Sequence, residues 1–306
     1  MFAPSTPDWS GIVVGVDGSP GALRAVRWAT EEAVGRRLPL RLVFAVDPLC
    51  QAGVGFPDRR VAESAMADAA EQAREVDASA EIVPEIVLAS PATALVGLAG
   101  RAAMICLGSN GARPAHPGHH TSTATEVILT ADCPVTVVRG PVPRHGWAVA
   151  RVEPEPFLFD VLDLAVAEAA MRNLPLRLLT NWDVHTGPSS DARDFDLRLR
   201  RDLDRWRSKH PRLDAVVVSA PDLDDFLSRN AARIALFVGS PRLRHDVGTV
   251  VDSSVESAVR LLDCPLIIGA GVTASTDGNG GTAWSLAGVE SASRPHGSTI
   301  GATQRT

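Results

Sequence analysis

Two parts of this 306-residue chain repeat each other, and the matching segments keep the same order. The stretch RRLPLRL at 36–42 returns as RNLPLRL at 172–178, 136 positions later. The triplet CPV at 133–135 returns as CPL at 264–266, 131 positions later. Because matches that keep their order are poorly explained by chance, the sequence predicts two copies of one fold, the second shorter in its middle.

Each copy alternates short apolar runs with helical segments. Ser19 and Pro20 mark a helix start, since serine caps helices and proline suits the first turn, while Pro84 predicts an edge strand. Strands with crossover helices between them predict a parallel sheet. The expected strands are 11–16, 40–46, 81–88, 103–107 and 134–138, then 147–152, 176–180, 213–219, 234–238 and 266–268. The expected helices are 20–37, 60–76, 91–102 and 122–130, then 157–172, 192–208, 223–232 and 250–262.

A Pro- and Gly-rich stretch at 140–146 separates the two copies and is typical of a linker. We therefore expect a first domain over 9–141 and a second over 142–271. Residues 1–8 and 272–306 are expected to be disordered, because the tail is rich in Gly, Ser, Thr and Ala and has no apolar period. The alternative for the tail is a docked C-terminal strand or helix.

Charge and composition disfavour several classes of protein. Lys and Arg number 30 against 36 Asp and Glu, a net charge of −6 that disfavours nucleic acid as a partner. No apolar run approaches the roughly 20 residues of a membrane helix, and the first eight residues lack the features of a secretory signal. The cysteines form no CxxC pair. Cys133 and Cys264 occupy equivalent places in the two copies, and we interpret both as buried thiols in a reducing compartment. We expect a cytoplasmic protein without a membrane partner.

Unusual residues follow two strands of the first copy. The first strand ends in GVDGS, which includes Asp17, and the fourth ends in GSNG, which includes Gly108 and Gly111. Ligands of parallel sheets bind at such carboxyl ends, and helix N-termini favour phosphate. Asp17 is suited to accept hydrogen bonds from a ribose or an adenine amine. In the alternative interpretation, which needs no ligand, Asp17, Gly18 and Ser19 form a turn with a helix cap, and Gly108 and Gly111 only shape a loop.

The segments IVVGVDGS at 12–19, GSNG at 108–111 and CPVTVVR at 133–139 resemble the universal stress protein (UspA-like) family. The resemblance covers about 9–271 and is stronger in the first copy. It implies two tandem flavodoxin-like domains (adenine nucleotide alpha hydrolase-like), each a five-stranded parallel sheet flanked by helices. Many members of the family bind ATP, and others do not. The positions that match its nucleotide site are Val16, Asp17, Ala45, Leu107, Gly108, Gly111, Thr121 and Ser122.

The same motif departs from the family pattern in both copies. Thr121 stands where the family has a third glycine, and its branched side chain would hinder close approach of phosphate. In the second copy, Glu153 stands at the Asp17 position, Arg242 replaces a glycine and Asp252 another. We expect at most one ATP site, in the first copy, with Mg²⁺ if ATP is bound. The second copy is interpreted as a structural partner, with binding of another anion by Arg242 and Arg244 as the alternative.

The sequence shows no catalytic constellation, so we expect a binding protein and not an enzyme. His116, His119 and His120 lie in a Pro-rich loop without a nearby carboxylate, which favours exposed side chains over a metal site. Lys209 is the sole lysine and lies outside the expected loop, unlike the lysine of a P-loop enzyme. The favoured function is a nucleotide-responsive stress protein. The alternatives are a scaffold that binds no nucleotide and a slow nucleotide hydrolase.

The last strand of each copy is apolar and begins at a proline. In an open sheet such strands would be edges, and apolar edges invite pairing. In the family, last strands pair across a dimer interface. We therefore expect the two copies to pair with each other within the chain, and a homodimer of the whole chain stays open.

Overall fold

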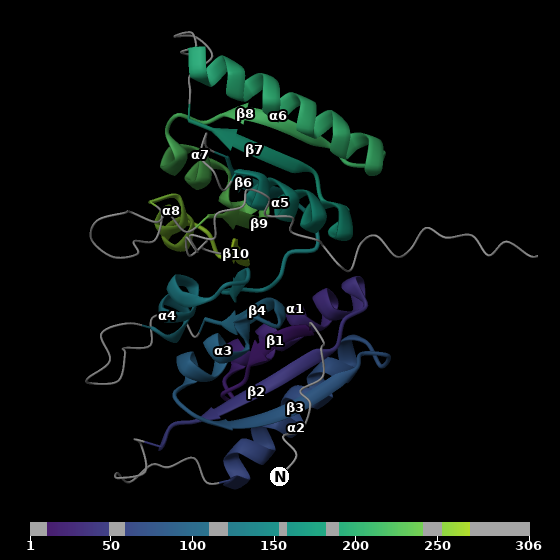
Figure 1. The fold of residues 1–306 in the computed structure, drawn as a ribbon, viewed down its shortest axis with the longest axis vertical. Helices are drawn as coiled ribbons and strands as arrows, with labels where there is room; N and C mark the ends of the chain where they lie inside the picture. The colour runs from purple at the N-terminus through teal and green to yellow at the C-terminus, as the bar shows by residue number, and fades with distance from the viewer. Residues whose placement is uncertain are drawn as a thin grey trace, which may run out of the picture.

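The computed structural model describes residues 11–48, 59–109, 122–152, 158–181, 190–240 and 253–269, and within them ten strands form one sheet. The order of the strands is β3-β2-β1-β4-β5-β10-β9-β6-β7-β8. Figure 1 shows the two halves of the chain stacked along the longest axis, with β3 and β8 toward opposite ends. The predicted α/β fold is confirmed. The terminal segments that are expected to be disordered, 1–8 and 272–306, lie outside the described residues, as does most of the segment between β9 and α8.

The predicted strands and helices are present, with ends that differ by a few residues. The strands are β1 (Gly11–Gly15), β2 (Leu40–Val46), β3 (Ile82–Leu88), β4 (Ala102–Gly108), β5 (Val135–Val138), β6 (Trp147–Arg151), β7 (Leu176–Thr180), β8 (Ala215–Ser219), β9 (Ile234–Gly239) and β10 (Leu266–Ile268). The helices are α1 (Pro20–Arg36), α2 (Arg59–Val76), α3 (Pro91–Ala99), α4 (Thr123–Thr130), α5 (Leu158–Arg172), α6 (Ser190–Lys209), α7 (Leu223–Asn230) and α8 (Ser253–Leu261), with a short 3₁₀ turn, η2 (Ala231–Arg233).

The repeat is visible in the backbone as well as in the sequence. Arg37 ends α1 with a φ of 57°, and Asn173, 136 positions later, ends α5 with a φ of 53°. Both residues adopt the left-handed conformation that commonly terminates helices. Each helix is then followed by the LPLRL segment that leads into β2 or β7. The two copies therefore share a helix end and a strand entry.

The two halves join through their last strands. Within each half the described strand pairs are parallel, whereas β5 and β10 pair antiparallel, with Val137 opposite Leu266 and Thr136 opposite Ile267. The prediction that the copies pair within the chain is confirmed. Antiparallel pairing here follows from a pseudo-twofold axis between the halves, which reverses the direction of the second set of strands.

One face of the sheet carries a core that is continuous across both halves. Helices α1 and α2 of the first half and α5 and α6 of the second pack on this face, and their apolar side chains form one cluster with β1, β2, β6 and β7. The opposite face carries two separate clusters, one under α3 and α4 and one under α7 and α8. The two halves therefore share one apolar core on the α1 and α5 side.

A buried charge cluster joins α1 to α5 within that core. The carboxyl groups of Glu32 and Glu168 are fully buried, and each lies within ion-pair distance of both Arg36 and Arg172. Arg172 also lies over the ring of Trp28, 3.8 Å from its centroid. Burial, together with the charge of Glu32, raises the pKa of Glu168 to about 8. Burial acts on Glu32 as well, but the charges of Arg172 and Arg36 hold the pKa of that carboxyl below its ordinary value.

Three described cysteines are free and buried: Cys106, Cys133 and Cys264. Burial raises the pKa of Cys133 and that of Cys264 to about 12, so both thiols stay protonated at neutral pH. The prediction of buried thiols at these two equivalent places is confirmed. Within the described ranges, no helix is both long and apolar enough to cross a bilayer.

Candidate functional site

The candidate site lies where the strand order of the first half reverses. β1 pairs with β2 on one side and β4 on the other, so the chain crosses from β1 to β2 over one face and reaches β4 over the opposite face. The carboxyl ends of β1 and β4 therefore diverge at this point, which is where parallel sheets bind ligands. The helix N-terminus that follows β1 points its free N–H groups to the same edge.

Asp17 follows β1 and is exposed at this edge. Its Oδ1 accepts a hydrogen bond from the backbone N–H of Ser19, at 2.9 Å. The turn requires Gly18, whose φ of +77° is unfavourable for residues with a side chain. Ser19 in turn caps α1, since its Oγ accepts from the N–H of Ala22 at 3.1 Å. The segment therefore forms the turn with a helix cap that the sequence offered as an alternative. This turn holds the carboxylate of Asp17 next to the N-terminus of α1.

The three apolar positions of the predicted site are divided between the two faces of the sheet. Val16 is buried in the core under α1 and α2, and its N–H donates to the carbonyl of Val43 at 2.8 Å. Leu107 is buried on the other face, in the cluster under α3 and α4, and half-buried Ala45 packs against the same cluster. Ala45 and Leu107 therefore share a face, near the ends of the two strands that flank β1, whereas the side chain of Val16 points to the other face.

Gly108 ends β4 directly against the first turn of α1. A Cβ at this position would lie 2.2 Å from the carbonyl carbon and oxygen of Gly21 and 2.5 Å from the nitrogen of Ala22. Real side chains do not approach backbone atoms that closely, so the absence of a side chain is required by packing whether or not a ligand binds. The close approach also places the N-terminus of α1 beside the end of β4.

Arg24 supplies a positive charge at the same edge. Its Nη2 donates to the carbonyl of Ser109, at 3.2 Å, and to that of Arg139, at 3.3 Å, so it ties the ends of β4 and β5 to α1. Its Nε is buried, and no hydrogen-bond partner for that atom is found within the described structure. Arg24 was not predicted as part of the site, because it lies 85 positions from Ser109 and no local pattern connects the two residues.

Ser122 begins the helix that follows the candidate loop. Its Oγ accepts from the N–H of Thr125 at 3.2 Å and lies 2.9 Å from the Oγ1 of the same residue, so it caps α4. Gly111 and Thr121, and the three loop histidines, lie outside the described residues. Across the parts of the chain that are described, no three His, Cys, Asp or Glu side chains gather as a metal-binding group.

Comparison with known proteins identifies the family. A model described as "Universal stress protein family" matches residues 10–139. Universal stress protein Rv2028c of Mycobacterium tuberculosis is 30% identical over 268 residues, which cover 84% of this chain and 95% of that protein. The chain belongs to the universal stress protein family. Universal stress protein Rv3134c of the same organism is 32% identical over 248 residues, 77% of this chain and 90% of that protein.

A solved structure shows the same tandem fold. The crystal structure of a universal stress protein from Archaeoglobus fulgidus covers 85% of this chain and 98% of its own, with a TM-score of 0.65 and 14% sequence identity. The family membership predicted from the motifs of the first copy is thereby confirmed, and the relatives extend over both halves. This universal stress protein is a tandem member of its family.

The second half differs at the equivalent strand ends. Arg151 ends β6 in the register that Gly15 has in β1, opposite Leu179 and Val43 respectively. The guanidinium of Arg151 extends past β7 and donates from Nη1 to the carbonyl of Ala220 at 3.1 Å. A long charged side chain therefore extends along this edge in the second half, whereas in the first half the side chains of Leu107 and Leu95 pack against Gly15. Glu153, Arg242, Arg244 and Asp252, on which the expected loss of binding also depends, lie outside the described residues.

Proposed function

We propose that this universal stress protein is a cytoplasmic, nucleotide-responsive regulatory protein that binds ATP in its first half, with Mg²⁺ as counter-ion of the phosphates. The observation that carries the proposal is the exposed carboxylate of Asp17, fixed by the N–H of Ser19 beside the N-terminus of α1. A carboxylate in this place suits the hydroxyls of a ribose, and free helix N–H groups suit phosphate. The protein acts by binding, without turnover of the nucleotide.

The two charged side chains at this edge suit different parts of the ligand. Asp17 would hold the nucleoside, since a carboxylate accepts from hydroxyl or amine groups and repels phosphate. Arg24 lies near the end of β4, and its guanidinium has donors beyond the two bonds from Nη2 to backbone carbonyls. We assign it to the phosphate side. The second half contributes no nucleotide site in this proposal, because Arg151 spans the equivalent edge.

Isothermal titration calorimetry with ATP and with adenosine, each with and without Mg²⁺, tests the proposal. Asp17→Ala should weaken both ligands by about 10-fold to 100-fold, as expected for hydrogen bonds to a charged group. Arg24→Met should weaken ATP more than adenosine. The matched control is Asp68→Ala, which removes an exposed carboxylate from α2 and should change neither affinity.

Other results would replace the proposal with one of its alternatives. If wild-type protein binds neither ATP nor adenosine, the protein is a scaffold that acts through protein contacts. Release of inorganic phosphate from ATP, at a rate that Asp17→Ala abolishes and Asp68→Ala does not, would instead identify a slow hydrolase. Equal losses in the Asp17 and Asp68 variants would show that the carboxylate beside α1 has no specific role.

A further inference from the structure

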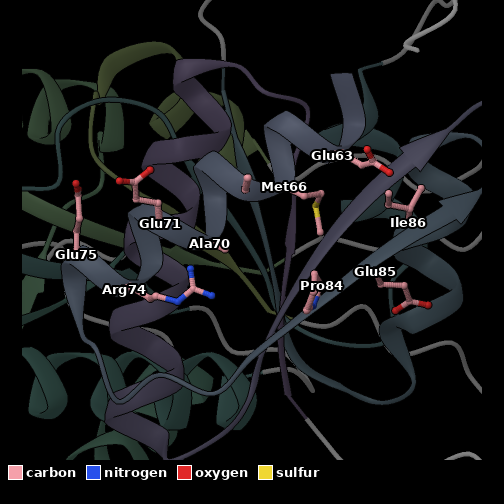
Figure 2. A pocket seen from close by; sticks show the side chains of 10 residues that line it. Glu63, Met66, Ala70, Glu71, Arg74, Glu75, Pro84, Glu85 and Ile86 are labelled. Carbon is pink, nitrogen blue, oxygen red and sulfur yellow. The ribbon is translucent and has the colours of Figure 1, made fainter. Parts of the chain in front are cut away.

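A groove of about 1100 Å³ lies between α2 and the edge strand β3, and none of the predicted nucleotide-site residues lines it (Figure 2). β3 is the last strand of the described sheet on this side, and the groove therefore runs along an open sheet edge. Met66 and Glu63 of α2 lie over Pro84 and Ile86 of β3. The remaining lining residues are Ala67, Ala70, Glu71, Arg74, Glu75 and Glu85.

The corner formed by α2 and β3 exposes large apolar side chains. Ile86 is 47% exposed, Leu88 68% and Val61 52%. Met66 is buried on the floor of the groove, and Pro84 adds a further apolar surface. Clustered apolar exposure at one edge is typical of an interaction surface, whereas scattered single residues are not.

The rim of this groove is acidic. Four glutamates line it against a single arginine, Arg74. Two of the four form ion pairs within the described residues. Glu85 forms an ion pair with Arg41 of β2 at 3.0 Å. Glu63 pairs with Arg59 at 2.8 Å, but both of those side chains are largely exposed, so an incoming cation can replace Arg59 at little cost. Glu71 and Glu75 lie one turn apart along the same side of α2. The groove therefore has an apolar floor and carboxylates along its rim.

The backbone of β3 offers hydrogen bonds to an added strand. The N–H of Leu40 donates to the carbonyl of Glu81, and Leu40 stands opposite Ile82 in the parallel register. In a parallel ladder this pattern turns the N–H and C=O groups of Ile82, and of every second residue after it, away from β2. Ile86 and Leu88 therefore present both groups at the open edge, while Pro84 presents a carbonyl alone.

We propose that this groove binds an extended, basic segment of a partner protein, which adds as a strand to the Glu85–Leu88 part of β3. Lysine and arginine fit both features of the groove, since their aliphatic stems cover apolar floor while their charged heads reach carboxylates. Alternate residues of the added strand face α2, so every second residue of the segment is basic or long and apolar.

A second copy of this chain fits the groove less well than a basic partner does. Pairing of two β3 edges would bring two acidic rims together, which opposes association. Pro84 also interrupts the row of N–H donors that a β3–β3 ladder needs, as edge prolines do in sheets that avoid self-pairing. The charge of the rim therefore selects a partner of opposite sign.

Fluorescence anisotropy of a labelled peptide of alternating lysine and valine, titrated with the full-length protein, tests this assignment. The basic peptide should bind, and a peptide of alternating glutamate and valine should not. Glu71→Lys should weaken binding of the basic peptide by about threefold to tenfold, and Ile86→Ser should weaken it as well. The matched control is Glu31→Lys, which makes the same charge change on the exposed side of α1 and should have little effect.

Three results would overturn the assignment. The first is equal binding of the acidic and basic peptides, and the second is an equal effect of Glu71→Lys and Glu31→Lys, which would indicate attraction by net charge alone. The third is self-association, seen in sedimentation as a dimer that Ile86→Ser abolishes. Far-UV circular dichroism of each variant separates a lost contact from a lost fold, and none of these readouts depends on nucleotide binding.

Discussion

Substitution of Gly108 by alanine tests whether packing of α1 on β4, and not a ligand, requires this glycine. The added Cβ would lie 2.2 Å from backbone atoms of Gly21. Since carbon atoms pack at about 3.5 Å, α1 and β4 would have to separate by roughly 1 Å. Overpacking typically costs about 1–3 kcal/mol, and because these atoms belong to backbone and cannot rotate aside, we expect a loss near 3 kcal/mol.

Gly97→Ala is the matched control for this substitution. Gly97 lies inside α3, and a Cβ there would meet nothing within 4 Å. Because glycine in a helix interior is less favourable than alanine, we expect this variant to gain about 0.5–1 kcal/mol. Urea unfolding followed by tryptophan fluorescence measures both changes, with buried Trp28, about two turns further along α1, as a reporter. If Gly108→Ala unfolds at the wild-type midpoint but loses nucleotide binding, the packing explanation is refuted.

The buried charge cluster yields two more predictions. Replacement of both Glu32 and Glu168 by glutamine leaves the partly buried Arg36 and Arg172 without an anion and should cost about 3–5 kcal/mol in urea unfolding. Exposed Glu63→Gln should cost about 0–1 kcal/mol, and similar costs for the two changes would contradict this account. Because burial raises the pKa of Glu168 to about 8 from 4.5, its contribution to stability is full below pH 4.5 and is lost as the pH rises through 8. Glu168→Gln should therefore gain stability relative to wild type between pH 5 and pH 9, and a constant difference between the two proteins would rule this out.

Much of the fold could be predicted from local signals. Ser19, Ser122 and the proline of β3 act over a few residues, as helix caps or as a break in a strand ladder, so their meaning does not depend on the rest of the chain. The repeat then supplied the number of domains, and the apolar last strands predicted how they join. Element ends were less predictable, because the end of a helix such as α3 depends on where the following strand must begin.

The candidate site could be predicted only in part. Asp17 was singled out because it directly follows a strand, and Ser122 by the resemblance to the family. The structure holds them in a turn and a helix cap, and their part in binding stays a prediction. For Gly108 the sequence left open a ligand contact or a loop-shaping role, whereas the nearest constraint in the structure is the backbone of Gly21, which lies far away in the sequence. Arg24 was missed for the same reason, since nothing near it in the chain indicates the two carbonyls that it binds.

The sequence alone therefore determined the class of fold, the two copies and the order of their elements, because helix caps, strand runs and repeats are short-range properties. Tertiary structure alone decided which side chains meet. The contact of Arg36 with Glu168, 132 positions apart, exists because α1 and α5 pack across the pseudo-twofold axis. Likewise, the groove beside β3 exists because no described strand follows it at the edge of the sheet. Such contacts depend on how distant segments pack, and a pattern within one segment does not specify which distant side chains it will meet.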